Sequence, residues 1–270
     1  MTVKVLITDE VDEAGVNMLH SAGFDVNYSP GMAKDELLRV IEQYHVLIVR
    51  SRTKVTKDVI ERGRNLVVIG RSGVGLDNID VEAARARGIE VVNSPEALTN
   101  STAELALGLM LAAARKIAYT HQQLSSGKWA KEESMGYELY GKTLGIIGFG
   151  RIGRRLAELA SCMGMSILAY DVVKPPEDAL RKVGAKLVAL EDIFAGSDFI
   201  SIHVTLTPQT KGMIGEPLLR KAKRNAIIVN TSRGEVFDAQ ALVKALESGW
   251  IAGAALDVYD KEPPEPGSKL

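Results

Sequence analysis

The stretch Leu144-Gly145-Ile146-Ile147-Gly148-Phe149-Gly150-Arg151-Ile152-Gly153 decides the fold of this 270-residue chain. Residues 143–147 form a short apolar run typical of a buried strand, and residues 154–160 resume with the apolar spacing of a helix. In the pattern Gly148-x-Gly150-x-x-Gly153, the first glycine suits a tight turn and the second lets a pyrophosphate approach the backbone. The third lets the helix pack closely on the strand, and the unpaired N–H groups at the helix start attract phosphate. This unit predicts a dinucleotide-binding site.

An acidic residue follows at the spacing that such a site requires. A second apolar run, residues 165–170, ends at Asp171, about 20 residues after the last glycine. A carboxylate there accepts hydrogen bonds from an adenosine ribose and repels a 2′-phosphate. The alternative is a glycine-rich packing corner with a surface aspartate. The order of strand, turn, helix and acid favours the first interpretation, with NAD rather than NADP as the cofactor.

The composition is that of an ordinary soluble globular protein. Hydrophobic residues make up 46% and charged residues 25%, and the formal net charge is -1. This balance predicts neither a nucleic-acid partner nor a membrane-surface partner. The N-terminus lacks a signal-peptide pattern, and no apolar run reaches the roughly 18 residues of a membrane span. The single Cys162, which we predict in the core, excludes an intrachain disulfide, so a cytoplasmic location is expected.

Strand and helix patterns alternate along the whole chain. The first group of predicted strands comprises residues 3–8, 24–28, 46–49, 66–69 and 89–92. Ser101-Thr102-Ala103-Glu104 has the form of a capping box and predicts one long helix over residues 101–118. The second group of predicted strands comprises residues 143–147, 165–170, 186–188, 199–204, 226–230 and 251–258. This alternation predicts an α/β fold with two doubly wound parallel-sheet domains, residues 1–97 and 98–270.

Polar residues follow several predicted strands, at the edge where ligands of such sheets bind. Arg50, Arg52 and Arg71 either converge on an anion or are solvated charges. Gly73-Val74-Gly75 either forms an anion-binding nest of backbone donors or makes a tight turn. Arg233 either clamps a carboxylate with two parallel hydrogen bonds or is a surface arginine in a turn.

The remaining candidate residues give weaker indications of catalysis or ligand binding. His203 is the only histidine that ends a predicted strand near this edge, and we interpret it as a hydrogen-bonded structural residue. No metal-ligand spacing and no Ser–His–Asp arrangement is visible, so no metal is predicted. An apolar patch is predicted at Trp129, Met135 and Tyr137, and it is covered either by a second subunit or by local packing.

A set of motifs along nearly the whole chain resembles the D-2-hydroxyacid dehydrogenase family, and within it the phosphoglycerate branch. The motifs that carry the resemblance are residues 49–56, residues 70–80, Asn93-Ser94-Pro95, Ala103-Glu104-Leu105, residues 148–153, Asn230-Thr231-Ser232-Arg233-Gly234 and residues 255–263. The resemblance implies a flavodoxin-like substrate-binding domain (1–97) and a Rossmann NAD-binding domain (98–270).

The resemblance also implies roles for individual residues. The implied catalytic residues are Arg233, on the substrate carboxylate and the C2 oxygen, and Glu262, beside a catalytic histidine. The implied cofactor-binding residues are Gly148, Gly150, Arg151, Ile152, Gly153, Asp171, Val204, Thr205, Thr231, Ser232 and Asp257. The implied substrate-binding residues are Arg50, Arg71, Ser72, Gly73 and Val74.

From this resemblance we expect NAD-dependent oxidation of D-3-phosphoglycerate, the first step of serine synthesis, by a homodimer or homotetramer. The three arginines favour a small phosphorylated hydroxy acid. One alternative is a glyoxylate or hydroxypyruvate reductase of the same family. Another is a non-catalytic NAD(H)-binding scaffold that resembles the C-terminal binding protein corepressors.

Two features depart from the family pattern. Thr205 stands where the family usually has proline. The family's catalytic histidine lies in a Pro-His-x-Gly motif after one further strand, followed by a helix that returns to the first domain, and the sequence stops at Leu270 before these. We therefore expect a truncated form of a longer active enzyme, with impaired turnover.

Overall fold

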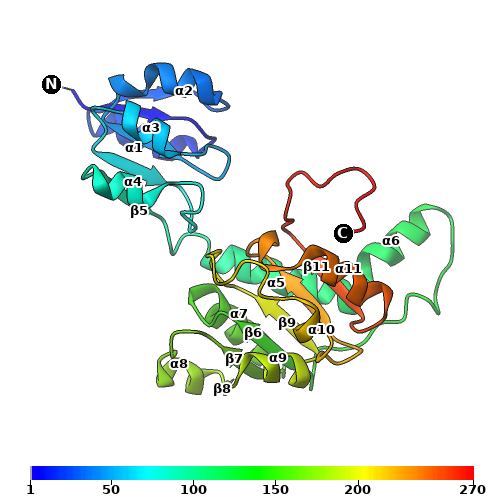
Figure 1. Cartoon of the computed structure of the whole chain (residues 1–270). Helices are drawn as coiled ribbons and strands as arrows, with labels where there is room; N and C mark the ends of the chain where they lie inside the picture. Colours follow the sequence, from blue (N-terminus) through cyan, green and yellow to red (C-terminus); the bar gives the residue numbers. More distant parts are fainter. Residues whose placement is uncertain (1) are drawn as a thin grey trace. The chain divides into compact units, whose positions relative to one another are not determined.

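The computed structural model describes residues 2–270, which divide into two compact units (Figure 1). The first unit is Met1–Leu98 and the second is Thr99–Leu270. Each unit is built on one sheet in which all strand pairs are parallel. Among residues 2–270, no helix is both long and apolar enough to cross a bilayer.

The first unit is a five-stranded sheet with the order β2-β1-β3-β4-β5. Its strands are β1 (Lys4–Ile7), β2 (Asp25–Tyr28), β3 (Val46–Val49), β4 (Val68–Arg71) and β5 (Glu90–Asn93). Its helices are α1 (Glu13–Ser21), α2 (Lys34–Val40), the 3₁₀ turn η1 (Ile41–Gln43), α3 (Lys57–Arg62) and α4 (Val81–Ala86). Successive residues of β1 point to opposite faces. Leu6 packs with α2 and α3 on one face, while Val5 and Ile7 pack with Val16 of α1 on the other. This is the flavodoxin-like strand order.

The second unit is a six-stranded sheet with the order β11-β10-β9-β6-β7-β8. Its strands are β6 (Thr143–Ile147), β7 (Ser166–Tyr170), β8 (Lys186–Leu187), β9 (Phe199–Ile202), β10 (Ile227–Asn230) and β11 (Gly253–Leu256). Its helices are α5 (Thr99–Ala114), α6 (Ile117–Ser125), α7 (Arg151–Cys162), α8 (Glu177–Lys182), α9 (Leu190–Gly196), α10 (Glu216–Leu219), the 3₁₀ turn η2 (Gly234–Val236) and α11 (Ala239–Glu247). The strand order reverses direction between β6 and β9, as in a Rossmann sheet. The predicted fold class is therefore confirmed.

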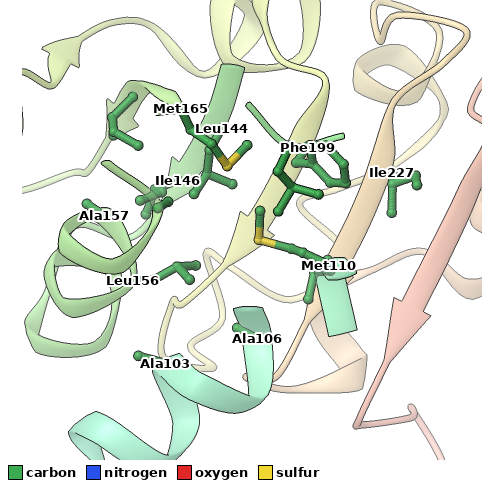
Figure 2. Packing of buried hydrophobic residues seen from close by; sticks show 14 of the residues in the cluster. Ala103, Ala106, Met110, Leu144, Ile146, Leu156, Ala157, Met165, Phe199 and Ile227 are labelled. Atoms are coloured by element: carbon green, nitrogen blue, oxygen red, sulfur yellow. The ribbon is translucent and has the colours of Figure 1, made fainter. Parts of the chain in front are cut away.

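Two layers of helices cover the sheet of the second unit. On one face, Ala103, Ala106 and Met110 of α5 pack with Leu156 and Ala157 of α7 against the sheet (Figure 2). The alanines have no side chain beyond Cβ, so the two helices approach closely. On the other face, the buried side chains of α9, α10 and α11 pack against Ile200, Ile202 and Ile228. Burial of both faces explains why these strands read as unbroken apolar runs.

The prediction of one long helix over residues 101–118 is wrong. The α5 helix begins at Thr99, so the predicted capping box lies inside it, and the chain turns at Lys116, whose φ is 52°. The carbonyl oxygen of Ala114 accepts a hydrogen bond from the Tyr137 N–H (3.1 Å), and Lys116 Nζ donates to the Glu133 carbonyl (2.7 Å). The returning loop thus ends α5, and a separate helix, α6, follows.

One further side-chain prediction is wrong. Cys162 is exposed rather than part of the core, because α7 turns its Leu156, Ala157 and Ala160 face to the sheet. Tyr137 follows the local-packing alternative for the apolar patch predicted with Trp129 and Met135. It packs on the core, with its ring centroid 6.1 Å from that of Phe199. Trp129 and Met135 are exposed by 80% and 72% within this chain.

Candidate active site

The three glycines after β6 have different surroundings. These surroundings show which glycines are required by contacts within the chain and which one leaves space for a ligand. Gly148 has a φ of +93°, and a Cβ there would lie 2.6 Å from the carbonyl oxygen of His203. A Cβ on Gly153 would lie 2.2 Å from the carbonyl oxygen of Gly148. A Cβ on Gly150 would meet nothing within 4 Å. The chain's own packing therefore accounts for the first and last glycines, whereas open space lies over Gly150.

The open space over Gly150 lies at the start of α7. Gly150 is the N-cap residue of this helix and supplies no side-chain cap. The N–H groups of Arg151 and Ile152 begin the helix, where the partial positive charge of the helix end favours an anion. Backbone donors and unfilled space together make a cradle that fits a pyrophosphate.

Asp171 follows β7 and is bonded to the glycine-rich loop. Its Oδ2 accepts a hydrogen bond from the Phe149 N–H (2.8 Å), and its Oδ1 accepts one from the Val173 N–H (3.0 Å). Each carboxylate oxygen has a further lone pair that a ribose hydroxyl can use. The same side chain therefore holds the loop in shape and offers an acceptor beside the cradle.

The residues after β9 pack against the glycine-rich loop on the side away from Asp171, since β9 and β7 flank β6. The His203 N–H donates to the Ile147 carbonyl (2.8 Å), and its imidazole lies 2.9 Å from Ser201 Oγ through Nε2. Burial lowers the pKa of His203 to about 4, so the ring is neutral at neutral pH. Val204 continues beside Gly148, and the Thr205 carbonyl accepts a hydrogen bond from Thr210 Oγ1 (2.7 Å). His203 thus has the hydrogen-bonded setting that the sequence predicted for it.

A buried asparagine shapes the turn that carries Arg233. Asn230, fully buried at the end of β10, donates from Nδ2 to the Arg233 carbonyl (2.8 Å). Its Oδ1 accepts hydrogen bonds from the Ser232 N–H (2.9 Å) and Ser232 Oγ (2.8 Å). Thr231 is 9% exposed, and its Oγ1 is buried without a hydrogen-bond partner from the chain. A buried hydroxyl in this state is a place for a ligand to bind.

The segment after β11 crosses directly over the turn of Arg233. A Cβ on Gly234 would lie 1.9 Å from the backbone carbon of Tyr259, so only glycine permits this crossing. Asp257 is exposed, and its N–H donates to the Asn230 carbonyl (3.0 Å). Glu262 is also exposed, and its Oε1 accepts a hydrogen bond from the Tyr259 N–H (3.1 Å).

The predicted cofactor residues therefore gather at one edge of the second sheet. Parallel pairing brings together the carboxyl ends of β11, β10, β9, β6 and β7. The residues at or just beyond those ends are Asp257, Thr231, Ser232, Arg233, His203, Val204, Thr205, Gly148, Gly150, Arg151, Ile152, Gly153 and Asp171. The cradle at Gly150, the Asp171 acceptor and the Thr231 hydroxyl fit a dinucleotide. Within residues 2–270, no group of three or more His, Cys, Asp or Glu residues could hold a metal ion.

In the first unit, Arg50 and Arg52 have different surroundings. Arg50 is exposed, with Nη1 3.2 Å from the Glu10 carbonyl oxygen. Arg52 is bound by the protein itself. Its Nη2 donates to the Thr8 carbonyl (2.6 Å) and lies 3.0 Å from Asp9 Oδ1, and its Nη1 donates to the Met32 carbonyl (3.2 Å). Arg52 is therefore held by acceptors of its own chain, and the convergence of Arg50, Arg52 and Arg71 on an anion stays a prediction.

Arg71 ends β4 and folds back over its own loop. It is 9% exposed, and its Nη1 donates to the Ser72 carbonyl (3.3 Å). A Cβ on Gly73, whose φ is +150°, would lie 1.2 Å from Arg71 Nη1, so the glycine makes room for the guanidinium. Asn93, at the end of β5, donates from Nδ2 to the Val74 carbonyl (2.6 Å). The loop of predicted substrate residues is thus held from both sides.

The sequence assigned no role to three polar residues that organise these loops: Asp9, which no motif included, and Asn78 and Asn230, which lie in motifs of the family resemblance. Asp9 and Asn78 are 3% and 5% exposed, and Asn230 is fully buried. Burial raises the pKa of Asp9, but hydrogen bonds from Thr53 and the Arg50 N–H and the charge of Arg52 outweigh it, so the pKa lies below its ordinary value. Asp9 stands just beyond a predicted strand, so the rule that selects strand ends could have found it.

Comparisons with known proteins agree with a dinucleotide-binding site in the second unit. The family model described as D-isomer specific 2-hydroxyacid dehydrogenase, NAD binding domain, matches residues 107–270. D-3-phosphoglycerate dehydrogenase of Methanocaldococcus jannaschii is 49% identical over 97% of this chain, which covers 50% of that protein. Hydroxypyruvate reductase of Thermotoga maritima is 46% identical over 97% of this chain and 84% of that protein.

A solved structure matches nearly the whole chain. The crystal structure of a glyoxylate reductase from Paecilomyes thermophila superposes with a TM-score of 0.90 at 32% identity, covering 98% of this chain and 84% of that one. The chain spans about half the length of the curated phosphoglycerate dehydrogenases of Methanocaldococcus jannaschii and Archaeoglobus fulgidus. Residues 107–270 thus carry the NAD-binding domain of the family, whereas the relatives' names differ in substrate.

Substitution of Asp171 tests the cofactor edge. We expect Asp171→Asn to narrow the preference for NADH over NADPH about tenfold or more, because it removes the charge that repels a 2′-phosphate but keeps an acceptor for the Phe149 N–H. Asp171→Ala removes that acceptor as well, so both cofactors should bind a further ~5- to 10-fold more weakly. Dissociation constants from fluorescence titration measure both effects.

Asp178→Ala, which removes an exposed carboxylate on α8, is the matched control and should change neither constant. Equal binding of NADH and NADPH by the unmutated chain would refute the role of Asp171.

Proposed function

The chain belongs to the D-isomer specific 2-hydroxyacid dehydrogenase family, and from this membership we propose that it serves NAD-dependent oxidation of D-3-phosphoglycerate at C2. The observation that carries the choice of a phosphorylated substrate is Arg50. Its guanidinium is exposed just beyond the carboxyl end of β3, where Nη1 donates to the Glu10 carbonyl (3.2 Å). A guanidinium in this setting can take a phosphate through two parallel hydrogen bonds.

In this proposal, residues of the first unit and residues of the second unit have separate substrate-binding roles. In the first unit, Arg50 and Arg71 bind the phosphate, and the loop of Ser72, Gly73 and Val74 binds the carboxylate. The N–H groups of Ser72 and Gly73 donate to the Val49 and Arg71 carbonyls (2.8 and 2.9 Å), so the Val74 N–H is the backbone donor that serves this role. In the second unit, Arg233 binds the carboxylate and polarises the C2 oxygen, from a turn that Asn230 fixes. A rigid turn keeps the guanidinium in place without a further ordering cost.

The cofactor edge of the second unit would hold NAD as described above. NAD bound there supplies the acceptor for the hydride that leaves C2. The hydroxyl proton leaves the substrate oxygen in the same oxidation, and Arg233 stabilises the negative charge that builds on this oxygen. Glu262, by analogy with the family, would orient and charge the histidine that takes the proton. The Thr231 hydroxyl, the Ser232 side chain and Asp257 would hold the nicotinamide end.

Two other functions remain as alternatives. A hydroxypyruvate or glyoxylate reductase would use the same cofactor edge and Arg233, and the relatives with these names are nearly as similar as the phosphoglycerate dehydrogenases. Such an enzyme has no phosphate to bind, so it gives no role to Arg50. An NAD(H)-binding scaffold would share the fold but would show no turnover with any hydroxy acid.

Arg50 provides the test of substrate choice in the full-length protein. We expect Arg50→Ala to raise the KM for 3-phosphoglycerate about 10- to 100-fold, the value of a charge-assisted hydrogen bond to phosphate. The KM for unphosphorylated D-glycerate should not change. Arg71 is less suitable, because it is 9% exposed and its removal would disturb the loop.

Arg64→Ala, another exposed arginine of the first unit, is the control and should leave both KM values unchanged. If Arg50→Ala has no effect on 3-phosphoglycerate, the phosphorylated substrate is the wrong choice. If hydroxypyruvate or glyoxylate is turned over far better than any phosphorylated acid, the reductase alternative is correct.

We also propose that the chain forms a homodimer, or a homotetramer built from it, through an apolar arm, defined as residues 115–135. Exposed apolar side chains gather along it at Ile117 (54%), Leu124 (60%), Trp129 (80%) and Met135 (72%). None of the α6 residues is buried within its own chain. An apolar hollow of about 600 Å³ lies beside α6, lined by Leu111, Ile117 and Leu124 among others. Apolar surface of this kind is typical of subunit interfaces.

A charge in the apolar arm should separate the subunits. We expect Leu124→Glu to shift the mass measured by light scattering from two or four chains to one. Burial of an unpaired carboxylate in the interface has a large free-energy cost, which favours the separated chains. Leu187→Glu, at an exposed leucine of β8 outside the apolar arm, should leave the mass unchanged. A single-chain mass for the unmutated protein would contradict the proposal.

A further inference from the structure

Asp9 is a buried carboxylate whose bonds all reach one short loop, residues 50–53. It is 3% exposed and stands two residues after the end of β1. Its Oδ2 accepts hydrogen bonds from the N–H groups of Arg50 (2.6 Å) and Thr53 (3.2 Å). Its Oδ1 accepts one from Thr53 Oγ1 (2.7 Å) and lies 3.0 Å from Arg52 Nη2. A carboxylate is rarely buried without such compensation, so every acceptor site is used for this loop.

Asn78 holds the same loop through its carbonyl groups. Its side chain is 5% exposed, and Nδ2 donates to the carbonyl oxygens of Arg50 and Thr53, both at 2.7 Å. Asp9 therefore binds the N–H groups of the two residues, and Asn78 binds their carbonyls. The backbone on both sides of the Arg50 Cα is fixed, although its side chain extends into solvent.

The residue after Asp9 binds the Arg50 side chain. The next residue, Glu10, provides the carbonyl oxygen that accepts the hydrogen bond from Arg50 Nη1 (3.2 Å). The buried side chain of Asp9 and the carbonyl of Glu10 thus come from adjacent residues beyond the end of β1. They hold Arg50 at its N–H and near the tip of its guanidinium.

We propose that Asp9 is a positioning residue for substrate binding, which acts through Arg50 by fixing residues 50–53 together with Asn78. The inference rests on the proposed function, in which Arg50 binds the substrate phosphate. A loop that is rigid before binding spares the substrate the cost of ordering it, so loosening the loop weakens binding of the phosphate. A merely structural role would lower stability without any dependence on Arg50.

Two sets of variants test the proposal in the full-length protein. Asp9→Asn keeps the shape of the side chain and one acceptor oxygen but loses the charge. Thr53→Val removes a hydroxyl bound to Asp9 at nearly constant shape, and Thr53→Ser restores this hydroxyl. If Asp9→Asn prevents folding, the Thr53 pair still carries the test.

We expect faster amide hydrogen exchange at residues 50–53 in Asp9→Asn and Thr53→Val, because the loop opens more easily. The KM for 3-phosphoglycerate should rise about tenfold in Asp9→Asn, by a smaller factor in Thr53→Val, and return to its original value in Thr53→Ser. In an Arg50→Ala background, Asp9→Asn should add less than about a twofold further rise, since the two residues act as one unit. The KM for NAD should stay constant throughout, because the cofactor residues lie in the second unit.

An unchanged KM for 3-phosphoglycerate despite faster exchange would overturn the proposal and leave Asp9 a structural residue. An equal effect of Asp9→Asn with and without Arg50 would overturn it as well. Unchanged exchange in Asp9→Asn, with a normal effect of Arg50→Ala, would overturn this inference alone. No effect of Arg50→Ala itself would refute the phosphorylated substrate and this inference with it.

Discussion

The close approach of three backbone segments at the end of β6 is the constraint on which the cofactor edge depends. Gly148 leaves no room for a Cβ beside the carbonyl oxygen of His203, and Gly153 leaves none beside the carbonyl oxygen of Gly148. The end of β9, the turn after β6 and the first turn of α7 are therefore locked together. This contact aims the N–H groups of α7 at the space over Gly150 and brings the Phe149 N–H to Asp171. Larger side chains at either glycine would separate these parts.

Both units use one further device: a polar side chain at the end of one strand holds the loop after its neighbour. Asp9 holds residues 50–53, Asn93 holds the Val74 carbonyl, and Asp171 holds the Phe149 N–H. Asn230 does the same for its own turn and Arg233. The candidate ligand-binding groups thus lie on loops that are rigid before a ligand arrives, as a site that binds by fixed geometry requires.

The local pattern of apolar residues predicted the strands, the helix after the glycine-rich turn and the fold class. Strands that are buried on both sheet faces consist of continuous apolar residues, which the sequence displays directly. Contacts between residues that are distant in the sequence produce no local pattern of this kind. The break at Lys116 depends on Tyr137 reaching back to Ala114, and the bound state of Arg52 depends on Thr8, Asp9 and Met32. An arginine that the fold uses and an arginine that a ligand uses look alike in sequence. The roles assigned to the site residues stay predictions until a ligand or a variant tests them.

The central claim is that the space over Gly150 is kept open for the pyrophosphate of NAD, and Gly150→Ala tests it most directly. The residue has a φ of −75°, which any residue adopts, and a Cβ there would meet no protein atom within 4 Å. Titration with NADH and urea unfolding, followed by tryptophan fluorescence, would measure affinity and stability in one preparation. The account predicts an unchanged unfolding midpoint and an affinity for NADH lowered about tenfold or more. An unchanged affinity for NADH in this variant would contradict the account.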